Sequence, residues 1–311
     1  MDNISFTPEE VARILKISRF TVYELIKRGE LTAYRIGRKV RVEEKDLEQY
    51  KQNAKGCCSP YLRQSTVREN NTAPEKRDGF IICGQDLALD ILSRQLEKQF
   101  PEGRFLRRYT GSIDGLMALY HGMANLVTAH LWDGDTGEYN LPYIRRILPG
   151  HKTLVYNLVY RMEGFYVAKG NPKEIYTWTD LTRPDIRFIN RECGSGARVL
   201  LDEQIRLLNI EHSQINGYDN EESSHLAVAS SVARKEADVG LGIEKTASQV
   251  DGVEFIPMHK ERYDLVFRKT DLQQPNFQIL LEILHSADFR NEISGIGGYD
   301  ISKIGQLMGE T

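Results

Sequence analysis

Residues 190–198, with the sequence Asn-Arg-Glu-Cys-Gly-Ser-Gly-Ala-Arg, constrain the fold of this chain more than any other stretch. The mostly apolar run that leads into them, residues 186–190, suits a buried strand. Gly194 and Gly196 permit a sharp turn and a close approach of the backbone to a ligand, and Ser195 is a favourable helix N-cap. Apolar residues then recur at helical spacing. The stretch therefore predicts a strand, a tight turn and the start of a helix.

A helix that begins in this way directs several unpaired N–H groups and one hydroxyl at a single point. Such a point favours an anion without requiring a lysine. We therefore expect an oxyanion seat made by the Ser195 hydroxyl and the amides of Gly196 and Ala197. The alternative is an ordinary strand-to-helix turn that Ser195 caps.

The chain has 311 residues, of which 41% are hydrophobic and 27% charged, as is typical of a soluble globular protein with two or three domains. The first ten residues lack the signal-peptide pattern, and no run approaches the roughly 18 apolar residues of a membrane span. We therefore expect a cytoplasmic protein that does not enter a membrane, with its four cysteines as reduced thiols. Cys57 and Cys58 are adjacent and are the candidates for sensing redox state.

Residues 1–54 predict a small DNA-binding domain. Residues 1–55 hold 12 Lys and Arg against 9 Asp and Glu, which leaves 29 against 35 in the acidic remainder. Thr7 with Glu10, and then Ser18, are typical caps of two short helices joined by a turn, and residues 31–42 alternate as in a β-hairpin with a basic tip. The side chains expected on DNA lie on the second helix and the hairpin: Ser18, Arg19, Thr21, Tyr23, Lys27, Arg35, Arg38 and Lys39.

Residues 6–50 resemble the excisionase and MerR-type winged helix-turn-helix family. The resemblance is carried by the pattern Ser-Arg-x-Thr-Val-Tyr, the Gly-Glu-Leu turn and the Arg-x-Gly-Arg wing. It implies double-stranded DNA as the partner. A helical protein-interaction module is the alternative, because basic hairpins also occur on solvated surfaces.

Residues 55–77 are polar and aperiodic, which predicts a linker before a second domain at residues 78–311. Strand–helix units recur from Phe80 onward, and repeated β-α-β units predict an α/β fold with mostly parallel sheets. Ligands of such sheets lie beyond the carboxyl ends of the strands. The residues expected at those ends are Gln85, Gly111, Ser112, Thr128 and His130.

A second set of strand–helix units begins near residue 164. Ser224 and His225 start a helix there in the same arrangement as Ser112 in the first set, so each half offers a serine-capped helix to a shared cleft. We therefore expect two lobes, residues 78–163 with 264–311 and residues 164–263, with Tyr263 beside the hinge as a further candidate ligand.

This two-lobed arrangement over residues 79–270 resembles the type II periplasmic binding proteins and, among them, the cytoplasmic branch of the molybdate-binding group. The resemblance implies molybdate or tungstate as the ligand, with no cofactor. Ala197 and Ser224 stand where the group usually has threonine, so a hydroxyl is missing at position 197. The residues that carry the resemblance are Gly111-Ser112 with Gly115-Leu116, His130-Leu131 with Asp133, residues 136–140, Asn190-Arg191, residues 194–196, Arg198 and residues 225–229.

A tetrahedral dianion can be held by neutral donors alone, which makes Ser112 and Ser195 the leading ligands. Arg198 lies one turn into its helix, where a salt bridge is the alternative to ligand contact, and the same alternative applies to Arg191. His130 and His225 can donate hydrogen bonds to a ligand or tie loops together. The sequence contains no P-loop, HExxH or Gly-x-Ser-x-Gly motif, so we expect a binding protein and not an enzyme.

These features predict a transcription regulator that binds operator DNA and responds to a small oxyanion, molybdate or tungstate. We expect a homodimer, because one wing-bearing module buries little surface on DNA and two half-sites give specific affinity. One alternative is an architectural DNA-binding factor of excisionase type, whose large domain mediates assembly. The other is a regulator that senses a different small anion.

Overall fold

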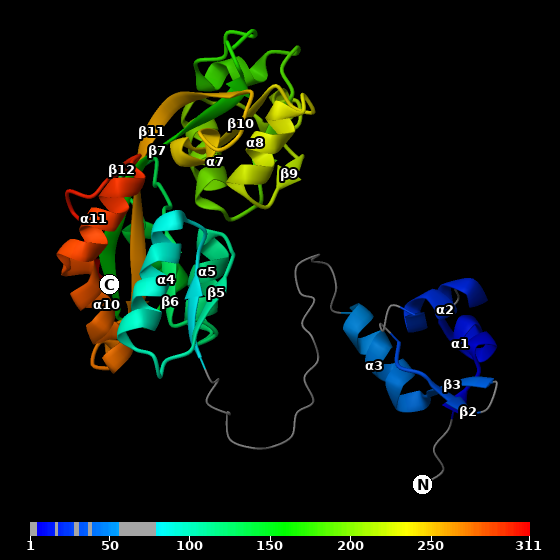
Figure 1. The fold of residues 1–311 in the computed structure, drawn as a ribbon. Coiled ribbons are helices and arrows are strands. Elements are labelled where there is room, and N and C mark those ends of the chain that lie inside the picture. Colours follow the sequence, from blue (N-terminus) through cyan, green and yellow to red (C-terminus); the bar gives the residue numbers. More distant parts are fainter. Residues whose placement is uncertain (1–4, 16–17, 28–30, 37–38, 56–78) are drawn as a thin grey trace. The chain divides into compact units, whose positions relative to one another are not determined.

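The computed structural model describes residues 5–15, 18–27, 31–36, 39–55 and 79–311 (Figure 1). Its contacts divide the chain into two compact units, Met1–Glu75 and Lys76–Thr311. Apart from Lys55 at the end of a helix, the linker predicted at 55–77 lies outside the described residues, as do Cys57 and Cys58. Among the described helices, none is both long and apolar enough to cross a membrane.

The first unit is a helix-turn-helix with a small antiparallel sheet of order β1-β3-β2. The hairpin of β2 and β3 confirms the predicted wing, whereas β1 is too short for an alternating pattern to predict. The elements are β1 (Ser5–Phe6), α1 (Pro8–Leu15), α2 (Arg19–Lys27), β2 (Tyr34–Ile36), β3 (Lys39–Glu43) and α3 (Glu44–Lys55).

Both predicted helix caps of this unit are present. The Thr7 amide donates to Glu10 Oε2 (2.7 Å) and the Glu10 amide donates to Thr7 Oγ1 (3.3 Å), which is a complete capping box. Ser18 Oγ accepts from the Thr21 amide (3.1 Å) at the start of α2. The caps set the apolar faces of the helices against one core, formed by Val11, Ala12, Val22, Leu25, Leu31, Val42 and Leu47.

The second unit is an α/β domain on one ten-stranded sheet, whose main path has the order β5-β4-β6-β11-β7-β10-β8-β9. The strands are β4 (Phe80–Cys83), β5 (Phe105–Arg108), β6 (Leu126–Ala129), β7 (Thr153–Ala168), β8 (Phe188–Arg191), β9 (Glu221–Glu222), β10 (Val239–Ile243), β11 (Val253–Arg268), β12 (Tyr299–Asp300) and β13 (Leu307–Glu310). The α-helices are α4 (Leu87–Gln99), α5 (Ser112–Tyr120), α6 (Leu141–Ile147), α7 (Gly196–Leu207), α8 (His225–Ala233), α9 (Glu244–Ala247), α10 (Pro275–His285) and α11 (Ala287–Ile296).

Two strands of 16 residues each, β7 and β11, pair antiparallel and run through both lobes (Figure 1). In lobe 1 the parallel strands β5, β4 and β6 join them through β11, and in lobe 2 the parallel strands β10, β8 and β9 join them through β7. Each lobe has its own buried clusters, with Leu158 and Phe277 in lobe 1 and Phe165 and Leu201 in lobe 2. The lobes therefore share only this strand pair as a continuous structural element, which makes the pair the hinge.

The strand–helix units β4–α4, β5–α5, β8–α7 and α8–β10 confirm the sequence prediction. β7 and β11 are much longer than the runs 164–168 and 263–267 that the sequence indicates as strands. The physical reason is that Arg161, Glu163 and Glu261 interrupt the apolar pattern in the middle of the pair while remaining buried. The elements α6, α11, β12 and β13 also have no counterpart in the prediction.

Candidate anion site between the lobes

A narrow cavity lies between the two lobes, where four helices begin. α4 starts just beyond Gln85, α5 at Ser112, α7 just after Ser195 and α8 at His225. The cavity has a volume of about 10 Å³, which is room for about one water molecule. The lining residues are Gln85, Thr110, Gly111, Ser112, Thr128, His130, Arg191, Ser195, His225 and Tyr263.

The starts of α5 and α7 touch each other across the cavity. The Ile113 amide of lobe 1 donates to the Gly194 carbonyl of lobe 2 (3.0 Å). A Cβ atom on Gly111 would lie 3.1 Å from the Gly194 oxygen and from the backbone of Ser195, so this approach favours glycine at position 111. Gly194 itself has φ +83°, a conformation that glycine adopts without strain. The glycines of both helix starts thus allow the lobes to close.

The lobe 1 face of the cavity is lined mainly by neutral hydroxyl groups. Thr128 Oγ1 and Tyr263 Oη are 2.7 Å apart and hydrogen-bonded, and Thr128 also donates to the Cys83 carbonyl (3.3 Å). Burial raises the pKa of Tyr263 to about 12, so its hydroxyl keeps its proton. Ser112 Oγ accepts from the His130 amide (3.3 Å), which leaves the hydroxyl hydrogen of Ser112 for a ligand.

Ser195, on the lobe 2 face, serves its own helix. Its Oγ donates to the Glu192 carbonyl (2.9 Å) and accepts from the Arg198 amide (3.3 Å), which is the N-cap predicted from the sequence. Ser112 differs, because Gly111 is the N-cap of α5 and makes no side-chain cap bond. The predicted symmetry of two serine caps is therefore wrong for Ser112, which is the first residue inside its helix.

Arg191 and His225 bring unpartnered polar atoms to the same face. Arg191 binds Glu192 through Nε (2.7 Å) and Nη2 (2.8 Å), while its buried Nη1 has no hydrogen-bond partner in the described part of the chain. His225 Nδ1 is likewise buried and unpartnered. Burial, and then the charge of Arg191, hold the pKa of His225 well below its ordinary value, so the ring stays neutral. Arg191 therefore supplies the cationic side chain that lines the cavity.

Eight of the twelve residues predicted as ligands line the cavity, and four do not. The Gly196 backbone packs against the His130 ring, where an added Cβ would meet the ring at 2.4 Å. Ala197 lies in the lobe 2 core, and Ser224 caps α8 by accepting from the Ala227 amide (3.1 Å).

Arg198 points away from the cavity. Its side chain binds Asp202 (3.1 Å) and Glu221 (3.1 Å) and lies 4.0 Å over the Tyr218 ring. The predicted salt-bridge alternative therefore describes Arg198, because Asp202, Glu221 and the Arg191 carbonyl engage its donors. Arg191, seven residues earlier, lines the cavity in its place.

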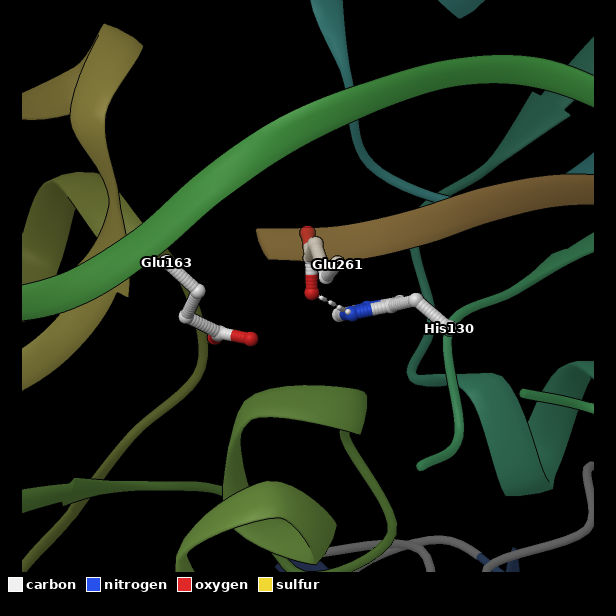
Figure 2. A group of neighbouring side chains, drawn as sticks. All are labelled: His130, Glu163 and Glu261. Carbon is white, nitrogen blue, oxygen red and sulfur yellow. Dashed lines mark hydrogen bonds and ion pairs between the residues drawn. The ribbon is translucent and has the colours of Figure 1, made fainter. Parts of the chain in front are cut away.

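A cluster of buried charges lies in the hinge beside the cavity, and the sequence does not predict it as a site. Arg161 of β7 binds Glu261 of β11 and also Asp86. Glu261 Oε2 is hydrogen-bonded to His130 Nδ1 at 2.7 Å (Figure 2). Burial, and then the neighbouring charge of Glu261, raise the pKa of Glu163 well above its ordinary value. Burial also opposes ionisation of Glu261, but Arg161 and His130 outweigh it and hold the pKa of Glu261 well below the usual range.

The candidate DNA-binding face of the first unit is described in part. Ser18, Arg19, Thr21 and Tyr23 are exposed, as the sequence predicts for the second helix. Arg19 lies 5.5 Å over the Tyr23 ring and 2.8 Å from Glu9. The side chains of Lys27, Arg35 and Lys39, and the whole of Arg38, lie outside the described residues.

Two family models match the chain. One, described as a PBP superfamily domain, matches residues 93–285, and the other, described as a helix-turn-helix domain, matches residues 5–55. Both agree with the units of the structure and cover most of the chain.

Relatives of known sequence or structure extend these matches. The chain is 44% identical over 307 residues to the uncharacterized protein YvgK of Bacillus subtilis (strain 168), covering 99% of this chain and 98% of YvgK. It is 32% identical over 107 residues to a sulfate-binding protein of Synechococcus elongatus, covering 33% of this chain and 30% of that protein. A phosphate ABC transporter substrate-binding protein of Clostridium perfringens, solved with bound phosphate, has a TM-score of 0.54 at 13% identity over 71% of this chain and 98% of its own. At that identity the structural similarity shows a shared fold.

Proposed function

This chain belongs to the family of the PBP superfamily domain, and from that premise we propose a transcription regulator that binds DNA through residues 5–55 and senses an oxyanion between its lobes. The helix-turn-helix unit supplies a DNA-binding function, and the larger unit supplies a ligand site. Closure of the lobes on the anion then changes how the chain binds DNA. The role is one of binding, without catalysis.

One observation carries the anion assignment. Four helices begin around the cavity, and α5, α7 and α8 place their caps or first residues in its lining. Arg191 also lines it, and among the described residues its buried Nη1 has no hydrogen-bond partner. Helix N-termini carry partial positive charge and N–H groups, and Arg191, although paired with Glu192, still offers a charged donor in Nη1. A buried donor without a partner is unfavourable, and an anion oxygen would satisfy it.

The size of the cavity supports a site that opens and closes. A tetrahedral oxyanion has five heavy atoms and does not fit a space for one water molecule, so the lobes must separate to admit it. In the closed form the Gly194 carbonyl accepts from the Ile113 amide, one of the donors at the start of α5. We expect an oxygen of the anion to replace this carbonyl, so that anion-free and anion-bound chains differ in lobe spacing.

We propose molybdate or tungstate as the ligand, on the resemblance of residues 111–140 and 190–229 to the molybdate-binding group. The Synechococcus relative is named as a sulfate-binding protein, and sulfate is also a tetrahedral dianion. Charge does not separate these ions, so discrimination depends on the spacing of donors around the opened cavity. Calorimetric titration of the full chain with molybdate, tungstate, sulfate and phosphate measures the four affinities and so gives their order.

The proposed regulatory function is tested by measuring whether anion binding changes the affinity of the chain for DNA. A duplex selected from a random pool by the full chain is titrated by fluorescence anisotropy, with and without saturating anion. We expect the DNA affinity to change by about 5- to 150-fold, the usual range of coupling between two sites. Unchanged DNA affinity with all four anions would instead favour an architectural factor.

The DNA-binding surface and the homodimer are part of the same proposal. The DNA affinity should fall steeply with salt, because basic side chains that contact phosphates release counterions. Sedimentation of the full chain with and without the selected duplex should show two chains per duplex. A single chain per duplex, or an affinity independent of salt, would contradict this part.

A further inference from the structure

Beyond the anion site, we propose that the hinge binds one divalent metal ion, of the manganese type, through His130, Glu163 and Glu261. The side-chain ligand atoms of these three residues all lie within 4.8 Å of one another, and all three residues are buried. They come from three segments, the end of β6, the middle of β7 and the middle of β11, and their polar ends point toward a common centre (Figure 2).

Glu163 is the observation that calls for a ligand. Its side chain is fully buried, and neither carboxylate oxygen has a hydrogen-bond partner among the residues that the structure describes. A buried carboxylate without a partner is strongly unfavourable, so the group needs a proton, a water molecule or a cation. The Tyr139 hydroxyl, also buried and unpartnered, is close enough for Glu163 and Glu261 to raise the pKa of Tyr139 further after the larger effect of burial.

The charge of the cluster favours a divalent cation. Asp86, Glu163 and Glu261 bring three buried carboxylates, and Arg161 is the cation that contacts two of them. Two further arginines nearby are already paired, Arg191 with Glu192 and Arg262 with Asp264. With Glu163 ionised, two formal negative charges are left over in the hinge. Without a cation, the raised pKa of Glu163 keeps a proton on this group beside Glu261, and one negative charge is left. A proton or a water molecule satisfies one oxygen, whereas a divalent ion satisfies Glu163, Glu261 and His130 together and offsets both charges.

The donor set indicates the class of metal. One imidazole nitrogen and two carboxylate oxygens suit a divalent first-row ion with several oxygen ligands, and three protein ligands leave positions for water. Arg161 keeps one oxygen of Glu261 engaged and so leaves the other, Oε2, facing His130. His130 Nδ1 and Glu261 Oε2 are 2.7 Å apart and hydrogen-bonded, so a metal ion takes the place of the proton between them and moves the two atoms slightly apart.

Manganese is the probe for this site, because its preference for oxygen ligands keeps it off the four cysteines. The full chain is treated with a chelator, exchanged into chloride buffer without any oxyanion, and titrated with Mn²⁺ while the signal of free Mn²⁺ is followed by electron paramagnetic resonance. We expect one bound ion per chain. The absence of oxyanion keeps this result independent of the proposed anion function.

Glu163→Gln keeps the shape of the side chain, removes its charge and should weaken Mn²⁺ binding at least tenfold. Glu97→Gln, the same change on the exposed face of α4, should bind like the parent. Thermal unfolding gives a second readout, because Mn²⁺ should raise the melting temperature of the parent and of Glu97→Gln but not of Glu163→Gln. A parent that binds no stoichiometric Mn²⁺, or a Glu163→Gln chain that binds it as well as the parent, overturns the metal site and leaves a proton or water on Glu163.

Discussion

Ser112 and Ser195 occupy the starts of α5 and α7, one in each lobe, and they look equivalent in the sequence. In the structure Ser195 is a helix cap whose hydroxyl already donates to the Glu192 carbonyl. Ser112 lies inside its helix and accepts from the His130 amide, so its hydrogen is available to a ligand. The difference shows that a hydroxyl at a helix start serves the ligand only where the helix does not need it.

The same contrast extends to the two faces of the cavity. The lobe 1 face offers a neutral donor, Ser112, beside the hydrogen-bonded pair Thr128 and Tyr263. The lobe 2 face offers Arg191 and His225, whose unpartnered nitrogens are buried. We therefore expect lobe 2 to provide the positive charge that binds the anion and lobe 1 to provide a hydrogen bond to it. Ser195 contributes by capping α7 at the edge of the site.

Replacing Arg191 should have the largest effect on anion binding. Arg191→Gln removes the cationic side chain of the lining, and loss of one partner of a buried charge pair costs about 2 to 5 kcal/mol, or thirtyfold or more in affinity. Calorimetric titration with molybdate measures this loss. Arg187→Gln, at a half-exposed arginine just before β8 that binds Asp238, should titrate like the parent. An Arg191→Gln chain that binds molybdate as tightly as the parent would show that lobe 2 does not provide the charge for the anion.

Ser112→Ala should have the next largest effect. It deletes one hydrogen bond to a charged ligand, worth about 1.5 to 3 kcal/mol, which corresponds to a tenfold to hundredfold weaker affinity. The stability of the chain should also fall, by about 1 to 3 kcal/mol, because the buried His130 amide loses its acceptor although the Ser112 hydroxyl does not cap α5. Thermal unfolding and calorimetry on the same sample separate the two quantities.

Ser195→Ala should affect stability more than affinity. Loss of an N-cap costs about 1 kcal/mol of stability. The Ser195 hydroxyl already donates to the Glu192 carbonyl, so its loss should weaken molybdate affinity by less than about fivefold. Ser224→Ala is the matched control, since Ser224 caps α8 but does not line the cavity. It should lose similar stability with no change in molybdate affinity. If Ser195→Ala weakens molybdate binding more than Ser112→Ala does, Ser195 and not Ser112 is the main hydroxyl donor to the anion.

Much of this site follows from local sequence patterns. Gly111, Ser195 and His225 are predictable because a strand end, a turn and a helix cap leave short-range signals, and parallel strands bring such ends to one edge. The hinge cluster is not predictable in the same way. Arg161, Glu163 and Glu261 lie in strands that pair over a separation of about 100 residues, so their contacts depend on register and not on local pattern.

The two arginines near the helix start of α7 illustrate the same limit. Arg191 and Arg198 are equally plausible ligands in the sequence, and only the fold separates them. Arg198 is one turn inside α7, where Asp202 and Glu221 engage its guanidinium group. Arg191 ends β8 and lines the cavity. The direction of a long side chain is set by its tertiary partners, which a local pattern does not contain.

The contact at the rim of the lobes should have the smallest effect and tests where closure is stabilised. Arg206 of α7 binds Asp135 of lobe 1 (2.8 Å), and both side chains are largely exposed. Exposed ion pairs are screened by water and salt, so Asp135→Asn should change the molybdate affinity by less than about threefold. The small change should vanish at high salt, whereas the effect of Ser112→Ala should persist because the cavity is buried. A large, salt-dependent loss in Asp135→Asn would mean that the rim, and not the contrast between Ser112 and Arg191, sets the affinity for the anion.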